Sequence, residues 1–166
     1  DTLQIAGPYD GKAPDQTASR QRIFVCDPSG VQDVLCAEEI LSALARRAYR
    51  RPVDEVDLEE LMRLFNAGSS EGFDAGIELA LEGLLAAPAF LFRIGQDPDG
   101  AAPGTVYQID DLELASRLSF FLWKSVPDEA LLNLAAAGRL SDPAVLEQQV
   151  SRLLADPRAV RWMNDF

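Results

Sequence analysis

Two cysteines, Cys26 and Cys36, carry the most distinctive chemistry of this chain, and both lie in the stretch VCDPSGVQDVLC. Two thiolates cannot complete a four-sulfur zinc or iron–sulfur site by themselves. The chain has no histidine, which excludes C-x-x-C-H heme attachment, histidine metal sites and triads that use a histidine base. The residues leave two interpretations open: a disulfide that closes a short loop, or two unrelated buried thiols.

Asp74, Glu78 and Glu82 form an acidic row, because their spacing of four places them on one face of a helix. Like charges at this spacing repel each other, so the row needs cations nearby. A metal ion is one interpretation, although carboxylates along one helix rarely converge on an ion without ligands from another element. The residues favour the alternative, which is a solvated face or pairing with the arginines of the preceding helix.

Those arginines form a basic cluster in the stretch ARRAYRRPV, and the cluster is a candidate site for an anion or a partner. Its residues are Arg46, Arg47, Arg50 and Arg51. A structural interpretation competes, because Glu38 and Glu39 open the same helix and charges at both ends then complement the helix dipole. The four arginines are the candidate interaction residues of the sequence.

The loop QDPDG resembles the start of a calcium-binding loop through Asp97 and Asp99. Ala102 replaces the glycine that such a loop needs at its sixth position, and Gln108 replaces the bidentate glutamate at the twelfth. Calcium is therefore not expected here.

Apolar residues recur at helical spacing in four segments, which run from about 36 to 50, 57 to 68, 73 to 87 and 111 to 125. Pro127, Pro143 and Pro157 open three further helices, the last two behind aspartate N-caps. The segment 111 to 125 is apolar nearly all round, so we expect that helix to be central and buried. Within it, Arg117 follows Glu113 by four residues, which predicts an intrahelical ion pair.

The centres of the apolar stripes should be mostly buried. They are Leu44, Leu61, Phe65, Ile77, Leu81, Leu118, Phe121 and Leu122.

The predicted fold is mainly α: a compact bundle of about seven helices with short extended N-terminal and mid-chain segments near residues 2–5 or 23–26 and 105–108. Asp, Gly and Pro residues between Gly95 and Gly104 mark a loop between two subdomains. We expect residues 1–22 to be a linker or the tail of a preceding domain. Residues 23–95 then form the first helical subdomain, and residues 96–166 form a second that is truncated at its C-terminal end.

The charge of the chain argues against some partners. Lys and Arg total 15 against 27 for Asp and Glu, so the 166 residues carry a net charge of −12 and repel phosphate backbones. We therefore expect no nucleic-acid partner. No apolar run reaches the roughly 18 residues that a membrane span needs, so membrane insertion is not expected. The N-terminus carries neither a Met nor a signal-peptide pattern, which favours a piece of a longer protein over a cytosolic chain.

Several long motifs resemble a family: IFVCDP, CAEEILSALARRAYRRPV, FDAGIELALEGLLAAPAFLFR and ELASRLSFFLWKSVPDEALLNLAAAGRL. They are similar to adjacent helical domains of unknown function in secreted multidomain proteins associated with planctomycete-type cytochromes. The resemblance implies export to the periplasm or another extracytoplasmic compartment, where Cys26 and Cys36 would pair as a structural disulfide. It implies a c-type heme elsewhere in the parent chain, although this sequence has no heme motif. It assigns no catalytic residue.

Two functions remain open. One is a non-catalytic helical scaffold or interaction module that docks against other domains of the same parent chain. The other is a part of an extracytoplasmic c-type-cytochrome oxidoreductase whose active site lies mostly outside these residues. In that second case Arg117, Trp123 or the basic cluster would line a shared cofactor or sugar pocket. The residues themselves contain no catalytic constellation, cofactor site or metal site, and they do not indicate an oligomeric state.

Overall fold

A computed structural model describes residues 17–28, 30, 33–92, 100, 102 and 104–160. These residues are mainly helical and none of them lies in a strand, which confirms the predicted mainly α fold. Eight α-helices and two short 3₁₀ turns occur in the described ranges, close to the seven helices expected. The segment 2–5, expected to be extended, falls outside the described residues.

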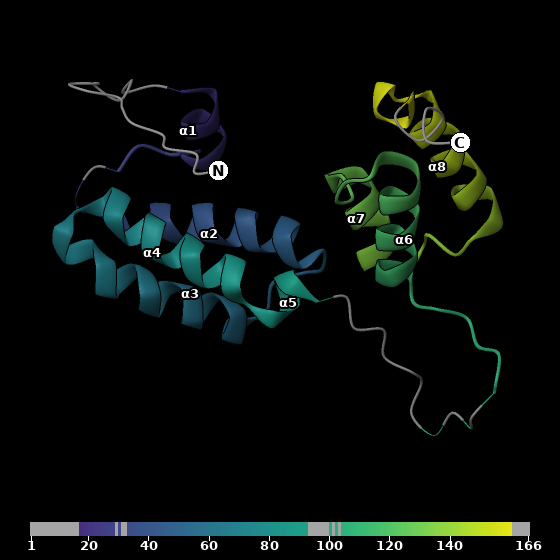
Figure 1. Cartoon of the computed structure of the whole chain (residues 1–166), viewed down its shortest axis with the longest axis horizontal. Helices are drawn as coiled ribbons and strands as arrows, with labels where there is room; N and C mark the ends of the chain where they lie inside the picture. Colours follow the sequence, from purple (N-terminus) through teal and green to yellow (C-terminus); the bar gives the residue numbers. More distant parts are fainter. Residues whose placement is uncertain are drawn as a thin grey trace, which may run out of the picture.

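Four helices make up the first group in Figure 1: α2 (Asp33–Tyr49), α3 (Glu55–Gly68), α4 (Phe73–Ala86) and α5 (Pro88–Leu91). The first three match the predicted segments, since their apolar spacing dictates one buried stripe each. The fourth was missed, because Pro88 was interpreted only as a terminator. A proline also fits the first turn of a helix, where its missing N–H has no partner to lose.

The contact between α3 and α4 is unusually close, and glycines allow it. A Cβ on Gly76 would lie 2.7 Å from the Phe65 ring and 2.8 Å from the Phe65 carbonyl oxygen. A Cβ on Gly68 would lie 2.8 Å from the carbonyl oxygen of Ala75. The two backbones therefore approach where side chains are absent, and this positions the buried residues Leu61, Phe65 and Ile77 in one core.

A short helix, α1 (Ala18–Ile23), precedes this group and was not predicted. Its sequence is too short and polar to show a helical period, and its local signal is Thr17, whose side chain accepts a hydrogen bond from the Arg20 amide. Residues 23–26 were the alternative place for a short extended segment; Ile23 ends α1, and the residues that follow it are neither helical nor part of a strand. Phe24 instead packs on Phe73, with ring centroids 6.1 Å apart.

The second group consists of α6 (Asp111–Trp123), α7 (Glu129–Ala136), α8 (Pro143–Ala155) and the 3₁₀ turn η2 (Pro157–Ala159) (Figure 1). Each element begins behind an aspartate N-cap: Asp110, Asp128, Asp142 and Asp156. The caps at Asp142 and Asp156 confirm the predicted aspartate N-caps in front of Pro143 and Pro157. The helix expected at Pro127 begins two residues later at Glu129, because Asp128 provides the cap. Residues 105–108 are neither helical nor part of a strand.

The predicted core positions divide into three classes. Leu61, Phe65, Ile77 and Leu122 are buried, whereas Leu44, Leu81 and Leu118 are half-buried. Phe121 is 56% exposed, so its predicted burial is wrong. The expectation that α6 is buried all round fails for the same reason. The small residues Ala115 and Ser119, together with Trp123, face the core instead.

The buried residues of the two groups form two separate clusters, one within residues 36–84 and one within residues 115–159. Arg46 on α2 links the groups. Its guanidinium donates to Glu129 Oε2 at 3.0 Å and to Asn133 Oδ1 at 2.6 Å, both on α7. Every helix in the described ranges is too short or too polar to span a bilayer.

Candidate functional site

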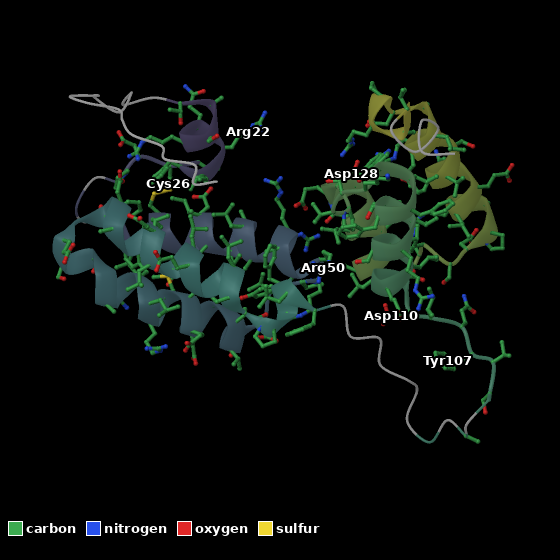
Figure 2. The ribbon with its side chains drawn as sticks, in the orientation of Figure 1. Arg22, Cys26, Arg50, Tyr107, Asp110 and Asp128 are labelled. Atoms are coloured by element: carbon green, nitrogen blue, oxygen red, sulfur yellow. A yellow bond between two sulfur atoms is a disulfide. The ribbon has the colours of Figure 1, made fainter. Side chains whose placement is uncertain are left out.

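The two cysteines are joined, which confirms the predicted pair. The Cys26 and Cys36 sulfurs lie 1.98 Å apart, and their Cα atoms are 5.8 Å apart. Figure 2 shows Cys26 in the segment between α1 and α2. The bond fastens the segment that carries Phe24 to the first turns of α2, where Cys36 is buried. The disulfide therefore has a structural position, in which it holds α1 and Phe24 close to α2.

The acidic row pairs with a different arginine from the one expected. Asp74 accepts two hydrogen bonds from the Arg20 guanidinium, at 2.6 and 3.0 Å, and Arg20 belongs to α1. Arg20 also lies over the Phe24 ring, 4.0 Å from its centroid. Glu78 and Glu82 are exposed. In the described ranges, no three cysteine, aspartate or glutamate side chains converge as metal ligands would.

Three of the four clustered arginines bind groups of this chain. Arg46 spans to α7, as described above. Arg50 is 9% exposed, has a left-handed φ of 59° and donates to the carbonyl oxygens of Ala89 and Phe92 at 2.9 and 3.3 Å. These are end carbonyls of α5, so Arg50 caps that short helix (Figure 2).

Arg51 makes a two-pronged ion pair with Asp57, at 2.6 and 2.8 Å. The hydrogen bonds to Asp57 raise the pKa of Arg51. Burial raises the pKa of Asp57, but hydrogen bonds from Arg51 and from the Asp54 amide outweigh it, so this pKa lies below its usual value. Asp57 completes a capping box with Asp54 at the start of α3. Arg47 is exposed. A binding role for the cluster stays a prediction.

Trp123 is a core residue of the second group. It is 1% exposed, and its Nε1 donates to the Leu153 carbonyl at 2.9 Å. The Arg158 guanidinium covers the indole at 3.4 Å from the ring centroid, within the range of a cation–π contact. The ring is thus enclosed by residues of α8 and η2, and the hypothesis that Trp123 lines a shared cofactor or sugar pocket finds no support in its burial.

Charged side chains surround this tryptophan. Arg158 pairs with Asp156, and the hydrogen bond from its side chain lowers the pKa of Asp156 to about 2. Arg152 pairs with Asp128 at 2.6 and 3.0 Å. Burial raises the pKa of Asp128, but the hydrogen bonds from Arg152 and the Leu131 amide outweigh it and lower this pKa. The Arg152–Asp128 pair joins α8 to the start of α7, and the Arg158 guanidinium joins η2 to α6 through its contact with Trp123.

Asp111 is a buried carboxylate with a structural role that its sequence position did not indicate. Its Oδ2 accepts from the Leu140 amide at 2.6 Å, and its Oδ1 accepts from the Ser141 amide at 3.1 Å. The loop between α7 and α8 is thereby fixed to the first turn of α6. Such a contact joins residues far apart in the sequence, so local patterns could not reveal it.

The outer side of α6 carries an open, shallow apolar groove of about 450 Å³. Leu114, Arg117, Leu118, Phe120 and Phe121 line it. Arg117 donates its Nε hydrogen to Glu113 Oε1 at 2.9 Å, which confirms the predicted intrahelical pair. The sequence signal for this groove was present as apolar residues at i, i+4 and i+7, but it was interpreted as a buried stripe.

The loop that resembles the start of a calcium-binding loop cannot be compared with the structure, because Asp97 and Asp99 lie outside the described residues.

Two family models match parts of the chain. Residues 36–94, which span nearly all of α2 to α5, match the model described as "PSD5: Protein of unknown function (DUF1595)". Residues 109–166, which include α6 to η2, match the model described as "PSD4: Protein of unknown function (DUF1592)". No curated protein and no solved structure matches the chain. The chain thus contains two helical segments, each similar to a family of domains of unknown function.

Proposed function

We propose that this chain is a non-catalytic helical scaffold or interaction module of a larger exported, cytochrome-associated protein. The observation that carries the proposal is the apolar side of α6, where Phe121 is exposed beside the half-buried Leu114 and Leu118. Large apolar side chains grouped on a surface are typical of a surface that binds another protein.

The side chains that were candidates for binding or catalysis also support a scaffold role. Arg50 and Arg51 bind a helix end and a capping aspartate, and Trp123 lies inside a core. Each of these groups holds elements of this chain together. Arg50, Arg51 and Trp123 thus stabilise the helical fold, and this fold exposes the apolar groove on α6 to a partner.

Export is supported by the Cys26–Cys36 disulfide, because disulfides form and persist in oxidising compartments such as the periplasm. The module docks, in this proposal, against other domains of its own parent chain, and a c-type heme belongs to one of those domains. The net charge of −12 disfavours nucleic acid as a partner.

The proposal is tested on the product of the complete gene. Its absorbance spectrum reports heme, and its turnover with an electron acceptor is measured before and after Arg117→Ala and Phe121→Asp. A scaffold role predicts that both variants change neither the spectrum nor the turnover per folded molecule, while Phe121→Asp lowers the melting temperature of the assembled protein. A loss of turnover with Arg117→Ala, at unchanged melting temperature, would instead support the oxidoreductase role.

A further inference from the structure

We infer that Arg46 is a clamp that holds the two groups of helices in a closed arrangement, and that the chain opens when this contact breaks. The guanidinium donates to Glu129 Oε2 at 3.0 Å and to Asn133 Oδ1 at 2.6 Å. These three residues, which we call the Arg46 clamp, join α2 of the first group to α7 of the second (Figure 1). The inference goes beyond the proposed function, because it concerns the shape of the module and not its partner.

The two groups share no apolar core among the described residues. The first cluster and the side chains packed against it end at Phe90, and those of the second begin at Leu112. Within the described ranges, the helices that pack extensively on one another all belong to the same group. Groups of helices without a large apolar interface are expected to move relative to each other. A polar contact between them therefore has a large influence on their arrangement.

The residues of the clamp are placed by their own helices. Arg46 lies in the last turn of α2 and Glu129 in the first turn of α7, where the helix dipoles favour these charges. Asn133 follows Glu129 by four residues, so both acceptors lie on one side of α7. The neighbouring Asp128 pairs with Arg152 instead. Both helices should thus persist when the clamp opens.

The clamp is weak enough to open. The side chains of Arg46 and Glu129 are 26% and 56% exposed, so water competes for both. Acidic residues also outnumber basic ones in both regions, 13 to 7 within residues 17–92 and 8 to 5 within residues 104–160, so the two regions repel each other. An exposed ion pair with one further hydrogen bond should change the ratio of closed to open molecules by about tenfold.

Small-angle X-ray scattering of the oxidised chain tests the clamp through the radius of gyration. Arg46→Glu should raise this radius, and Glu129→Arg should raise it as well. The two substitutions change the net charge in opposite directions, so general repulsion cannot raise the radius in both. Combining them restores a pair of opposite charges and should bring the radius back toward that of the original chain. An unchanged radius in both single variants, or no recovery in the double variant, would overturn the inference.

Arg63→Glu is the matched control. Arg63 pairs with Glu60 on the same helix, so this substitution makes the charge change of Arg46→Glu without touching the clamp. It should leave the radius unchanged, and an equal rise would attribute the opening to net charge and refute the clamp. Far-UV circular dichroism checks that each variant keeps its helices.

Two milder variants keep the test decisive where Glu129→Arg fails to fold. Glu129→Gln removes the charge that Arg46 binds, and Asn133→Ala removes the second acceptor. Each should raise the radius by less than Arg46→Glu does, and no rise in either would refute the clamp. A chain of fixed shape would leave the proposed function intact, since that proposal is judged by spectrum and turnover.

Discussion

The helices of residues 17–92 and those of residues 104–160 are held together in different ways. In the first region, glycines let α3 and α4 approach closely, the Phe73 ring makes a tilted contact with Phe24 and an edge-on contact with Phe65, and a disulfide fastens the N-terminal segment. In the second, the buried Trp123 lies among ion pairs, and the carboxylate of Asp111 fixes a loop. Close packing and a covalent bond stabilise one region, and charged contacts around one ring stabilise the other.

This difference shows how two small helical cores reach stability with few residues each. A core of limited size buries little apolar surface, so additional constraints have large effects. The first region has a constraint that a reductant can remove, and the second has none of that kind among its described residues. The two regions should therefore respond separately to the same treatments.

The largest expected effect is that of Trp123→Ala. The substitution leaves a cavity at the centre of the second cluster and removes the hydrogen bond to the Leu153 carbonyl. We expect a loss of about 3 to 5 kcal/mol in the free energy of unfolding of that region. Urea unfolding followed by circular dichroism measures it, with Trp123→Phe as the milder control. A loss below about 1 kcal/mol would mean that the ring is not the centre of this core.

Removal of the disulfide should have the next largest effect. Replacing both Cys26 and Cys36 by alanine frees the segment that carries Phe24, and a loop of this length contributes about 3 kcal/mol in the chain-entropy model. Urea unfolding of the oxidised protein, the reduced protein and the double variant compares the three states. The reduced and double-variant proteins should agree, and a reductant should not affect the variant. Equal stability of all three states would contradict the role of the bond as a staple.

A glycine pair tests the close approach of α3 and α4. Gly76→Ala should destabilise the first region by about 1 to 3 kcal/mol, because its Cβ meets the Phe65 carbonyl as well as the ring. Gly83→Ala should cost less, since its Cβ meets only the flexible end of Leu64, and alanine is the better helix former. Melting temperatures of the two variants rank them. If Gly83→Ala proved the more harmful, the proposed backbone contact would be wrong.

Acid should weaken the second region by a smaller amount. The pKa of Asp156 is about 2 in the folded chain against an ordinary value of 3.8, because Arg158 donates hydrogen bonds to it. A folded pKa below the unfolded one means that this stabilisation is complete above about pH 4 and is lost as the pH falls toward 2. Asp156→Asn keeps the cap but removes the charge, so it should flatten this part of a stability profile measured by tryptophan fluorescence. An unchanged profile in the variant would exclude Asp156 as its source.

The sequence predicts features that depend on local patterns. Apolar spacing identified α2, α3, α4 and α6, and aspartate followed by proline identified the starts of α8 and η2. The disulfide followed from the resemblance to exported proteins. These features share one property: the residues that determine them are neighbours along the chain or belong to a recognisable motif.

Features that depend on distant residues were missed or assigned wrongly. Asp74 pairs with Arg20, which lies 54 positions away, so the spacing of the acidic row gave no hint of its partner. The predicted orientation of α6 about its own axis was wrong, because leucine and phenylalanine contribute more to a hydrophobic pattern than alanine and serine do. In the structure, the small Ala115 and Ser119 are the residues that let α6 lie close to its neighbours. The seven-residue spacing of Gly76 and Gly83 was a local signal for the α3–α4 contact that went unused.

One measurement tests most directly whether the two regions are stabilised independently. The chain has two tryptophans, Trp123 and Trp162, so in a Trp162→Phe background the fluorescence comes from Trp123 alone and reports on the second region, while far-UV circular dichroism reports on both regions. Urea unfolding is followed with both probes, with and without a reductant. The reductant should lower the midpoint of part of the circular dichroism transition and leave the fluorescence midpoint unchanged. A single transition that shifts equally in both probes would contradict separate stabilisation of the two regions.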